Sequence, residues 1–159
     1  MTATSDAPRE IALTIREATA ADIPAIVAML ADDPLGRKRE SPDDLAPYRE
    51  AFAAVETDPN QLLVVAEREG AVVGTVQLSF LPGLSRRGAL RAQIEAVRVR
   101  GDQRGNRVGE RLIRWAIDTA RERGAVLVQL TSDASRTDAH RFYQRLGFEP
   151  THMGFKLIF

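Results

Sequence analysis

The chain has 159 residues, 44% of them apolar, and its 22 basic residues balance its 22 acidic residues. This length suits one domain with its own core, and a net charge of zero argues against a general nucleic-acid binder. The chain has no cysteine, which excludes disulfides, thiolate metal sites and a cysteine nucleophile. No apolar run approaches the roughly 20 residues that span a bilayer, so we expect a cytoplasmic protein that does not enter a membrane.

The first half of the chain predicts a polar tail, a strand and two helices. Residues 1–10, MTATSDAPRE, lack the apolar stretch of a secretory signal, and we expect a disordered tail before a single domain at residues 11–159. Alternation predicts a strand at 11–16. Thr19–Asp22 has the pattern of a capping box and predicts a helix start. Ser41–Asp44, with proline second and two acids after it, predicts another.

The second half is richer in strand patterns and ends in an alternation of helices and strands. Runs at 62–66 and 72–80 predict a hairpin around Glu69–Gly70. The later expected elements are strands at 91–99, 125–131 (buried on both faces) and 153–159, and helices at 108–123 and 137–146. The order β-α-α-β-β-β-α-β-α-β predicts a single-domain α/β fold whose mixed, mostly antiparallel sheet has helices on both faces.

The most unusual stretch is RGDQRGNRVGERL, residues 100–112, which lies where a strand is followed by a helix. A helix N-terminus offers unpaired backbone N–H groups and a partial positive charge, which together bind phosphate. Glycine at 105 and 109 lets an anion approach the backbone, and Arg104 and Arg107 add positive charge. The stretch matches neither a P-loop nor a dinucleotide-binding turn. A phosphate cradle and an ordinary solvated loop are both open on this evidence.

Two motifs carry a family resemblance. Arg104-Gly-Asn-Arg-Val-Gly109 resembles the pyrophosphate loop of the GNAT N-acetyltransferases, Arg/Gln-x-x-Gly-x-Gly/Ala. Ala139-His-Arg-Phe-Tyr-Gln-Arg-Leu-Gly-Phe148 resembles that family's A-x-x-F-Y-x-x-x-G-F segment, and the element order agrees over essentially the whole chain. The sequence departs from the family at two positions. Arg107 stands in place of the middle glycine of the loop, and Arg136 in place of an asparagine seven residues before the motif tyrosine.

The resemblance implies that acetyl-CoA is the co-substrate, with no metal ion. In this family the strand before the loop splays from its neighbour and the thioester lies in the gap, so backbone groups of Val97 and Val99 would align the pantetheine. Loop N–H groups would hold the pyrophosphate. The implied coenzyme-binding residues are Val97, Arg98, Val99, Arg104, Gly105, Asn106, Arg107, Val108, Gly109, Glu110 and Arg136.

Attack of an amine on the thioester needs a base for the amine and an acid for the leaving thiolate. Glu95 is the candidate base because it lies in mid-strand between apolar neighbours, although alternation alone is equally typical of a surface glutamate. We expect Gln93, Glu95, Val97 and Val99 to share one face, so Gln93 would bind substrate or water in the same pocket. The resemblance makes Tyr143 the candidate acid; without the motif, it would be interpreted as a core aromatic residue.

The predicted function is an acetyl-CoA-dependent N-acetyltransferase that transfers the acetyl group directly to the amine of a small molecule. One alternative is a non-catalytic acyl-CoA-binding module on the same fold, and another is an acetyltransferase of protein or peptide amines. A third is a nucleic-acid binder that uses the eight arginines between Arg98 and Arg123, although aromatic interleaving is absent. His140 and His152 lack acidic or cysteine ligands at metal spacing, so no metal site is expected.

The acceptor and the oligomeric state are the least determined features. In the family, the pocket is formed by segments that correspond here to about 32–48 and 81–91. The first segment is acidic and could attract a cationic amine, or its acids could only cap a helix and line a turn. Homodimers are common on this fold, but no sequence feature fixes one here. The expected partners are a small-molecule amine and a possible second copy, with no nucleic acid and no membrane.

Overall fold

The computed structural model describes residues 12–159, so the expected disordered tail at residues 1–10 lies outside the described residues. Five strands form one sheet in the order β1-β2-β3-β4-β5, in which only the β4–β5 pair is parallel. The strands are β1 (Thr14–Glu17), β2 (Gln61–Arg68), β3 (Ala71–Leu81), β4 (Arg91–Val99) and β5 (Leu127–Leu130). The α-helices are α1 (Ile23–Ala31), α2 (Ala46–Thr57), α3 (Ser85–Gly88), α4 (Val108–Glu122) and α5 (Thr137–Arg145), with 3₁₀ turns η1 (Ala20–Asp22), η2 (Gly36–Lys38) and η3 (Gly101–Gln103). This confirms the predicted mixed, mostly antiparallel α/β fold.

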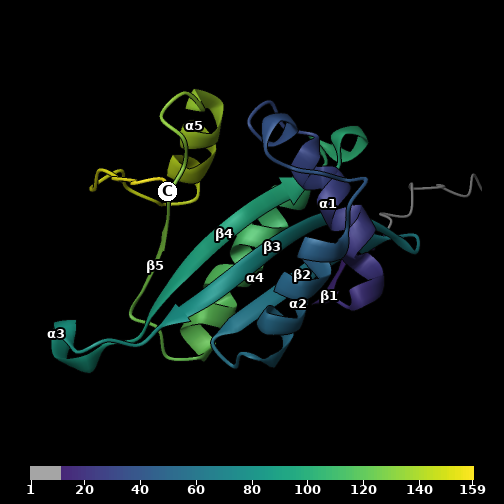
Figure 1. The fold of residues 1–159 in the computed structure, drawn as a ribbon. Helices are drawn as coiled ribbons and strands as arrows, with labels where there is room; N and C mark the ends of the chain where they lie inside the picture. The colour runs from purple at the N-terminus through teal and green to yellow at the C-terminus, as the bar shows by residue number, and fades with distance from the viewer. Residues whose placement is uncertain (1–11) are drawn as a thin grey trace, which may run out of the picture.

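The two faces of the sheet carry different helices (Figure 1). On one face, the central strands pack against α4, whose buried side chains include Leu112, Ile113 and Ala116. On the other face, α1 and α2 form a smaller core around Ile23, Val27 and Phe52. Successive strand residues point to opposite faces, so the alternation in β2 and β3 supplies both cores. Among the described residues no helix is long and apolar enough to cross a membrane.

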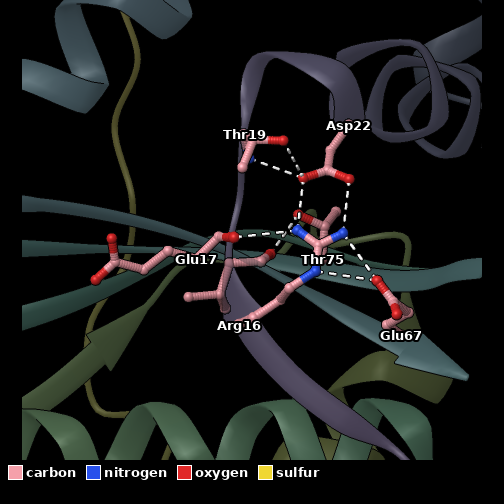
Figure 2. Close-up of polar contacts among 7 residues, drawn as sticks. Arg16, Glu17, Thr19, Asp22, Glu67 and Thr75 are labelled. Atoms are coloured by element: carbon pink, nitrogen blue, oxygen red, sulfur yellow. Dashed lines mark hydrogen bonds and ion pairs between the residues drawn. The ribbon is translucent and has the colours of Figure 1, made fainter. Parts of the chain in front are cut away.

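A buried aspartate ties the first strand to the first helix (Figure 2). The Asp22 carboxylate accepts a hydrogen bond from the Thr19 backbone N–H at 2.7 Å, as the capping box predicts. It also accepts hydrogen bonds from Arg16 of β1 at 2.8 and 3.0 Å, and Arg16 donates to Glu67 of β2 at 3.0 Å. The charged hydrogen bonds from Arg16, and then the backbone one from Thr19, lower the pKa of Asp22, although burial opposes them. The capping residue Asp22, predicted from local sequence, therefore also holds Arg16, which links β1 to β2.

Several predicted helix and strand boundaries differ from the structure, most of all at α2 and β5. Helix α2 begins at Ala46 rather than near Ser41. Residues 41–44 instead form a turn in which the Asp44 N–H donates to the Ser41 carbonyl at 3.1 Å, and the Ser41 N–H donates to the Tyr48 hydroxyl at 2.8 Å. The strand predicted at 125–131 and expected to be buried on both faces is shorter and only half-buried. It pairs with β4 alone among the described strands, so one side of it is left at the sheet edge.

The strand predicted at 153–159 is absent from the structure. Residues 149–159 form no helix or strand, and every one of them is exposed. A lone extended segment has no partner for its backbone N–H and C=O groups, so its side-chain pattern cannot make a strand without a neighbouring edge.

Candidate active site

The two parallel strands, β4 and β5, lie at one edge of the sheet and separate partway along β4. Pairing between β4 and β5 runs from Arg91–Leu127 to Ile94–Leu130 and then stops, while β4 continues to Val99 along β3. From Glu95 onward, therefore, none of the described strands pairs with the β5 side of β4. The free backbone N–H and C=O groups of such a strand edge can bind an extended ligand as an additional strand would.

A β-bulge lies at the point of separation. Gln77 of β3 faces Glu95 and Thr75 faces Arg98, so two residues of β4 stand opposite the single residue between them. One of the two, Ala96, has a positive φ of 50°. An extra residue shifts the alternation of side chains by one.

The bulge corrects the expectation that Gln93, Glu95, Val97 and Val99 share one face. Val97 and Val99 pack against the core beside α4. Gln93 and Glu95 lie on the opposite face, where they are half-buried. The bulge was invisible in the sequence because it arises from pairing with a strand elsewhere in the chain.

Polar side chains form a row across four strands on the face that carries Glu95. Gln93 donates a hydrogen bond to Glu95 and accepts one from Gln129 of β5 at 2.9 Å. On the neighbouring strands, the Gln61 side-chain oxygen accepts hydrogen bonds from Gln77 at 2.8 Å and Ser79 at 2.7 Å. Four members of this row were not predicted as site residues: Gln61, Gln77, Ser79 and Gln129. The available signal was glutamine or serine at alternate positions of predicted strands. This row gives Glu95 positioned partners and offers donors and acceptors to a polar ligand.

An apolar cavity of about 210 Å³ adjoins this row. Its walls come from α1 and α2, including Val27, Tyr48 and Phe52, and it extends to Gln77 and Ala96 on the sheet. The cavity therefore reaches the bulge, one residue from Glu95. It has room for a small apolar group beside the polar row.

Beyond β4, the loop and the start of α4 have the conformation that an anion site requires. Gly105 has φ +84°, and a Cβ built there meets nothing within 4 Å, so the backbone is open at this point. Val108, the first residue of α4, is buried and anchors the start of the helix. Gly109 packs beside Val99 and Phe142. The N–H groups of the first turn of α4 have no acceptors within the helix. The residues present thus fit a pyrophosphate group.

Arg107 adopts the left-handed conformation, φ 59°, that a glycine would adopt readily. Its guanidinium hydrogen-bonds the Glu110 carboxylate at 3.0 and 3.1 Å, and Arg114 donates to the same carboxylate at 2.9 Å. The hydrogen bonds from Arg107 and Arg114 lower the pKa of Glu110 to about 2. The Arg107 side chain is therefore directed to the first turn of α4, and Gly105 remains open.

The acidic turn after α1 is neutralised within the chain. Asp33 lies 3.4 Å from the Arg98 guanidinium, and Asp32 lies 3.5 Å from that of Arg104. Glu40 accepts a hydrogen bond from Tyr48. Three acids of the segment proposed to attract a cationic amine, Asp32, Asp33 and Glu40, thus have internal partners. The Arg98 side chain is directed to Asp33, so its backbone is what it offers to a ligand on β4.

Tyr143 lies on α5, half-buried between two aromatic rings. Its ring meets Phe142 and Phe148 edge-on, at centroid distances of 5.2 and 5.9 Å. Burial raises the pKa of the Tyr143 hydroxyl, and the nearby charges of Arg136 and Arg98 oppose that shift. Arg136 is the N-cap residue of the same helix. A tyrosine held protonated in this way can donate a proton.

The two histidines bond backbone or neighbouring groups, although His140 lies on α5 with Tyr143. His140 bonds the Asp133 carbonyl through Nε2, and His152 bonds the Thr151 hydroxyl. Within residues 12–159, no group of three or more possible metal-ligating side chains comes together.

Comparison with known proteins identifies the class of protein. The acetyltransferase (GNAT) family profile matches residues 23–148. The aminoalkylphosphonate N-acetyltransferase of Salmonella typhimurium is 33% identical over 141 residues, which cover 89% of this chain and 88% of that protein. An L-methionine sulfoximine/L-methionine sulfone acetyltransferase of Pseudomonas paraeruginosa is 30% identical, covering 86% and 80%. A solved structure from Bacillus halodurans, described as a transcriptional regulator, is 46% identical with a TM-score of 0.90, covering 93% of this chain and all of that one.

The chain therefore belongs to the acetyltransferase (GNAT) family. The prediction of an acetyl-CoA-dependent N-acetyltransferase is confirmed at this level.

Proposed function

We propose that the enzyme transfers the acetyl group of acetyl-CoA directly to the amine of a small molecule that also carries an oxygen-rich polar group. The observation that carries this proposal is the course of β4. The strand leaves β5 after Ile94, bulges at Ala96 and leads through the open loop into the first turn of α4. One continuous segment thereby offers a strand edge for an amide-containing arm and a helix N-terminus for phosphate.

The coenzyme-binding residues follow from this course. Val97 and Val99 partly bury their side chains on the α4 side, so their backbone groups are what β4 offers along its free edge. The loop from Arg104 through Gly105, Asn106, Arg107 and Val108 to Gly109 and Glu110 holds the pyrophosphate, mainly through backbone N–H groups. Arg98 contributes through its backbone, and Arg136 adds positive charge at the start of α5. Acetyl-CoA supplies the activated acetyl group.

Glu95 and Tyr143 divide the proton transfers between them. Glu95 accepts the proton of the attacking amine, directly or through a water molecule, and its hydrogen bond from Gln93 orients the carboxylate. Tyr143 donates a proton to the departing thiolate; a tyrosine hydroxyl is protonated at neutral pH, and burial raises the pKa of this one further. The reaction forms a C–N bond, breaks the C–S bond and leaves the released thiol protonated.

The acceptor class is inferred from the pocket together with the relatives. An apolar cavity beside a row of glutamines and serine suits a small amine with a short apolar part and a polar oxygen-rich group. The relatives named above act on an aminoalkylphosphonate and on L-methionine sulfoximine or sulfone. We therefore place this enzyme among acetyltransferases of aminophosphonates or amino-acid analogues. We propose that it acts in the cytoplasm, without a metal ion.

The test combines coenzyme titration with an amine screen. Calorimetric titration is expected to show saturable binding of acetyl-CoA and weaker binding of dephospho-CoA. Thiol release is then measured with aminoalkylphosphonates, L-methionine sulfoximine, L-methionine sulfone and a peptide with a free N-terminus, with and without EDTA. Release with the small amines, unaffected by EDTA, is expected. Coenzyme binding without release from any amine would instead identify a non-catalytic acyl-CoA-binding module, and release with the peptide alone would identify a protein acetyltransferase.

A further inference from the structure

Gln129 is the one polar residue of β5, and it faces the candidate base. Its neighbours Val128 and Leu130 pack against the main core. Because side chains alternate along a strand, the Gln129 side chain lies on the opposite face of the sheet. That face carries Gln93 and Glu95, and all three side chains are half-buried. A buried amide is almost always hydrogen-bonded, so the partners of Gln129 indicate its role.

Two hydrogen bonds connect Gln129 to Glu95. Gln129 and Gln93 are register partners on neighbouring parallel strands. The Gln129 side-chain N–H donates to the Gln93 side-chain oxygen at 2.9 Å, and the Gln93 side-chain N–H donates in turn to the Glu95 carboxylate. These three side chains form what we call the amide bridge, which runs from β5 to the candidate base on β4.

The chemistry of the side chains fixes the direction of the amide bridge. A glutamine carries one acceptor oxygen and one donor NH₂ group, whereas an ionised carboxylate only accepts. Gln93 therefore turns its NH₂ group to Glu95 and its oxygen to β5, where Gln129 donates to it. Both ends of the Gln93 amide are thereby held. Hydrogen bonds in such a chain polarise one another, which strengthens the charged bond to the carboxylate.

The amide bridge crosses from β4 to β5 just before the two strands separate. One more pair, Ile94 with Leu130, follows the pair that Gln93 makes with Gln129, and the ladder ends there. Glu95 is thus the first residue of β4 that has no backbone partner on β5. On that side, the amide bridge ties its side chain to β5 at the point where backbone pairing stops.

We propose that Gln129 is a positioning residue for acetyl transfer. By holding the Gln93 amide, it fixes the Glu95 carboxylate in the orientation in which the carboxylate accepts the proton of the attacking amine. Gln129 acts through Gln93 and needs no contact of its own with the reacting atoms. The inference rests on the proposed role of Glu95 as the base.

A double-mutant cycle tests this role, with kcat measured by thiol release below neutral pH. Gln129→Met keeps the length of the side chain and removes its donor. We expect kcat to fall about tenfold, because a small displacement of a reacting group is costly. The KM for acetyl-CoA should change less than about twofold, because Gln129 acts on the base and not on the coenzyme. In the Glu95→Gln background the same substitution should lower kcat less than about twofold, because no base is left to position.

The matched control is Gln144→Met, on the exposed side of α5, which should leave kcat unchanged in both backgrounds. Circular dichroism verifies that each variant is folded. Equal losses from Gln129→Met in the two backgrounds would show that Gln129 acts independently of Glu95, and would overturn the inference. A wild-type kcat in folded Gln129→Met would overturn it as well.

NMR of the side-chain amides detects the amide bridge without acetyl transfer. The Gln93 NH₂ resonance is assigned by its disappearance in Gln93→Met. We expect it to shift in Gln129→Met and in Glu95→Gln, and to stay in place in Gln144→Met. A Gln93 resonance that Gln129→Met leaves unchanged would refute the amide bridge.

The cycle also distinguishes a failure of this inference from a failure of the proposed function. A wild-type kcat in Glu95→Gln alone would refute the base role, and the inference with it. A large loss in Glu95→Gln together with a wild-type kcat in Gln129→Met would refute only the role of Gln129.

Discussion

The Arg98 guanidinium lies 3.4 Å from the Asp33 carboxylate, and the two side chains are only 12% and 10% exposed. Arg98 also donates to the Val97 carbonyl at 2.8 Å, while its buried Nε has no hydrogen-bond partner. Burial lowers the pKa of Arg98, and Asp33 opposes that shift. The Arg98–Asp33 ion pair therefore links the turn after α1 to the part of β4 that follows the bulge.

Asp33→Asn should destabilise the protein by about 2–3 kcal/mol, because it removes the compensating charge of a buried arginine. Urea unfolding at neutral pH measures the loss. Asp43→Asn, in the exposed turn before α2, is the control and should have an effect below about 0.5 kcal/mol. Equal stabilities of the Asp33 variant and the wild type would show that the ion pair adds nothing to folding.

Tyr143→Phe should lower kcat by about 10²-fold or more while changing the acetyl-CoA Kd less than threefold, because it removes a proton donor and keeps the ring. Burial raises the pKa of Tyr143, so the wild-type rate should not fall through ionisation of this hydroxyl between pH 7 and about 10. Thiol-release kinetics and calorimetry separate the two constants. A wild-type kcat in the variant would exclude Tyr143 from the chemistry.

Glu95→Gln should lower the rate most below neutral pH, where the amine acceptor is fully protonated and a base is needed. The deficit, about 10²-fold at pH 6, should shrink as the pH approaches the amine's own pKa. The measurement is a pH profile of kcat/KM beside that of Glu122→Gln, an exposed glutamate on α4. Parallel profiles for the wild type and the Glu95 variant would assign the base role to another group.

Asp22→Asn should cost about 2–3 kcal/mol at pH 7, because charged hydrogen bonds from Arg16 are lost. The pKa of Asp22 is lowered in the folded protein, so its contribution is complete above its unfolded value of about 3.9 and is lost as the pH falls through the folded pKa. The difference between wild type and variant should therefore narrow in urea unfolding below about pH 4. A difference that stays constant down to pH 2 contradicts the electrostatic account.

Gly36→Ala should destabilise the protein by about 3 kcal/mol or prevent folding, because a Cβ there would stand 1.9 Å from the Leu30 backbone oxygen. Gly83→Ala is the matched control, since a Cβ at that position meets nothing within 4 Å. Thermal unfolding of the two variants decides the point. Similar unfolding temperatures would mean that the turn after α1 shifts to accommodate the added methyl group without loss of stability.

Local sequence was sufficient wherever a feature depends on near neighbours. Local contacts a few residues apart produce the Thr19–Asp22 capping box, the turn between β2 and β3 and the transition from loop to helix at Val108. Side-chain periodicity of 2 or 3.6 residues therefore predicted the order of the strands and longer helices up to α5, but not the short α3 in the loop predicted between β3 and β4. Together with two short motifs, it also predicted the family.

Tertiary structure decided the features that depend on distant partners. The bulge at Ala96 places Glu95 and Val97 on opposite faces, because it arises where β4 pairs with β3. The ion pair of Arg98 with Asp33 joins residues far apart in the chain, so no periodicity predicts it. The carboxyl-terminal segment has the sequence of a strand, but a strand also needs a partner, and in the structure this segment pairs with none of the described strands.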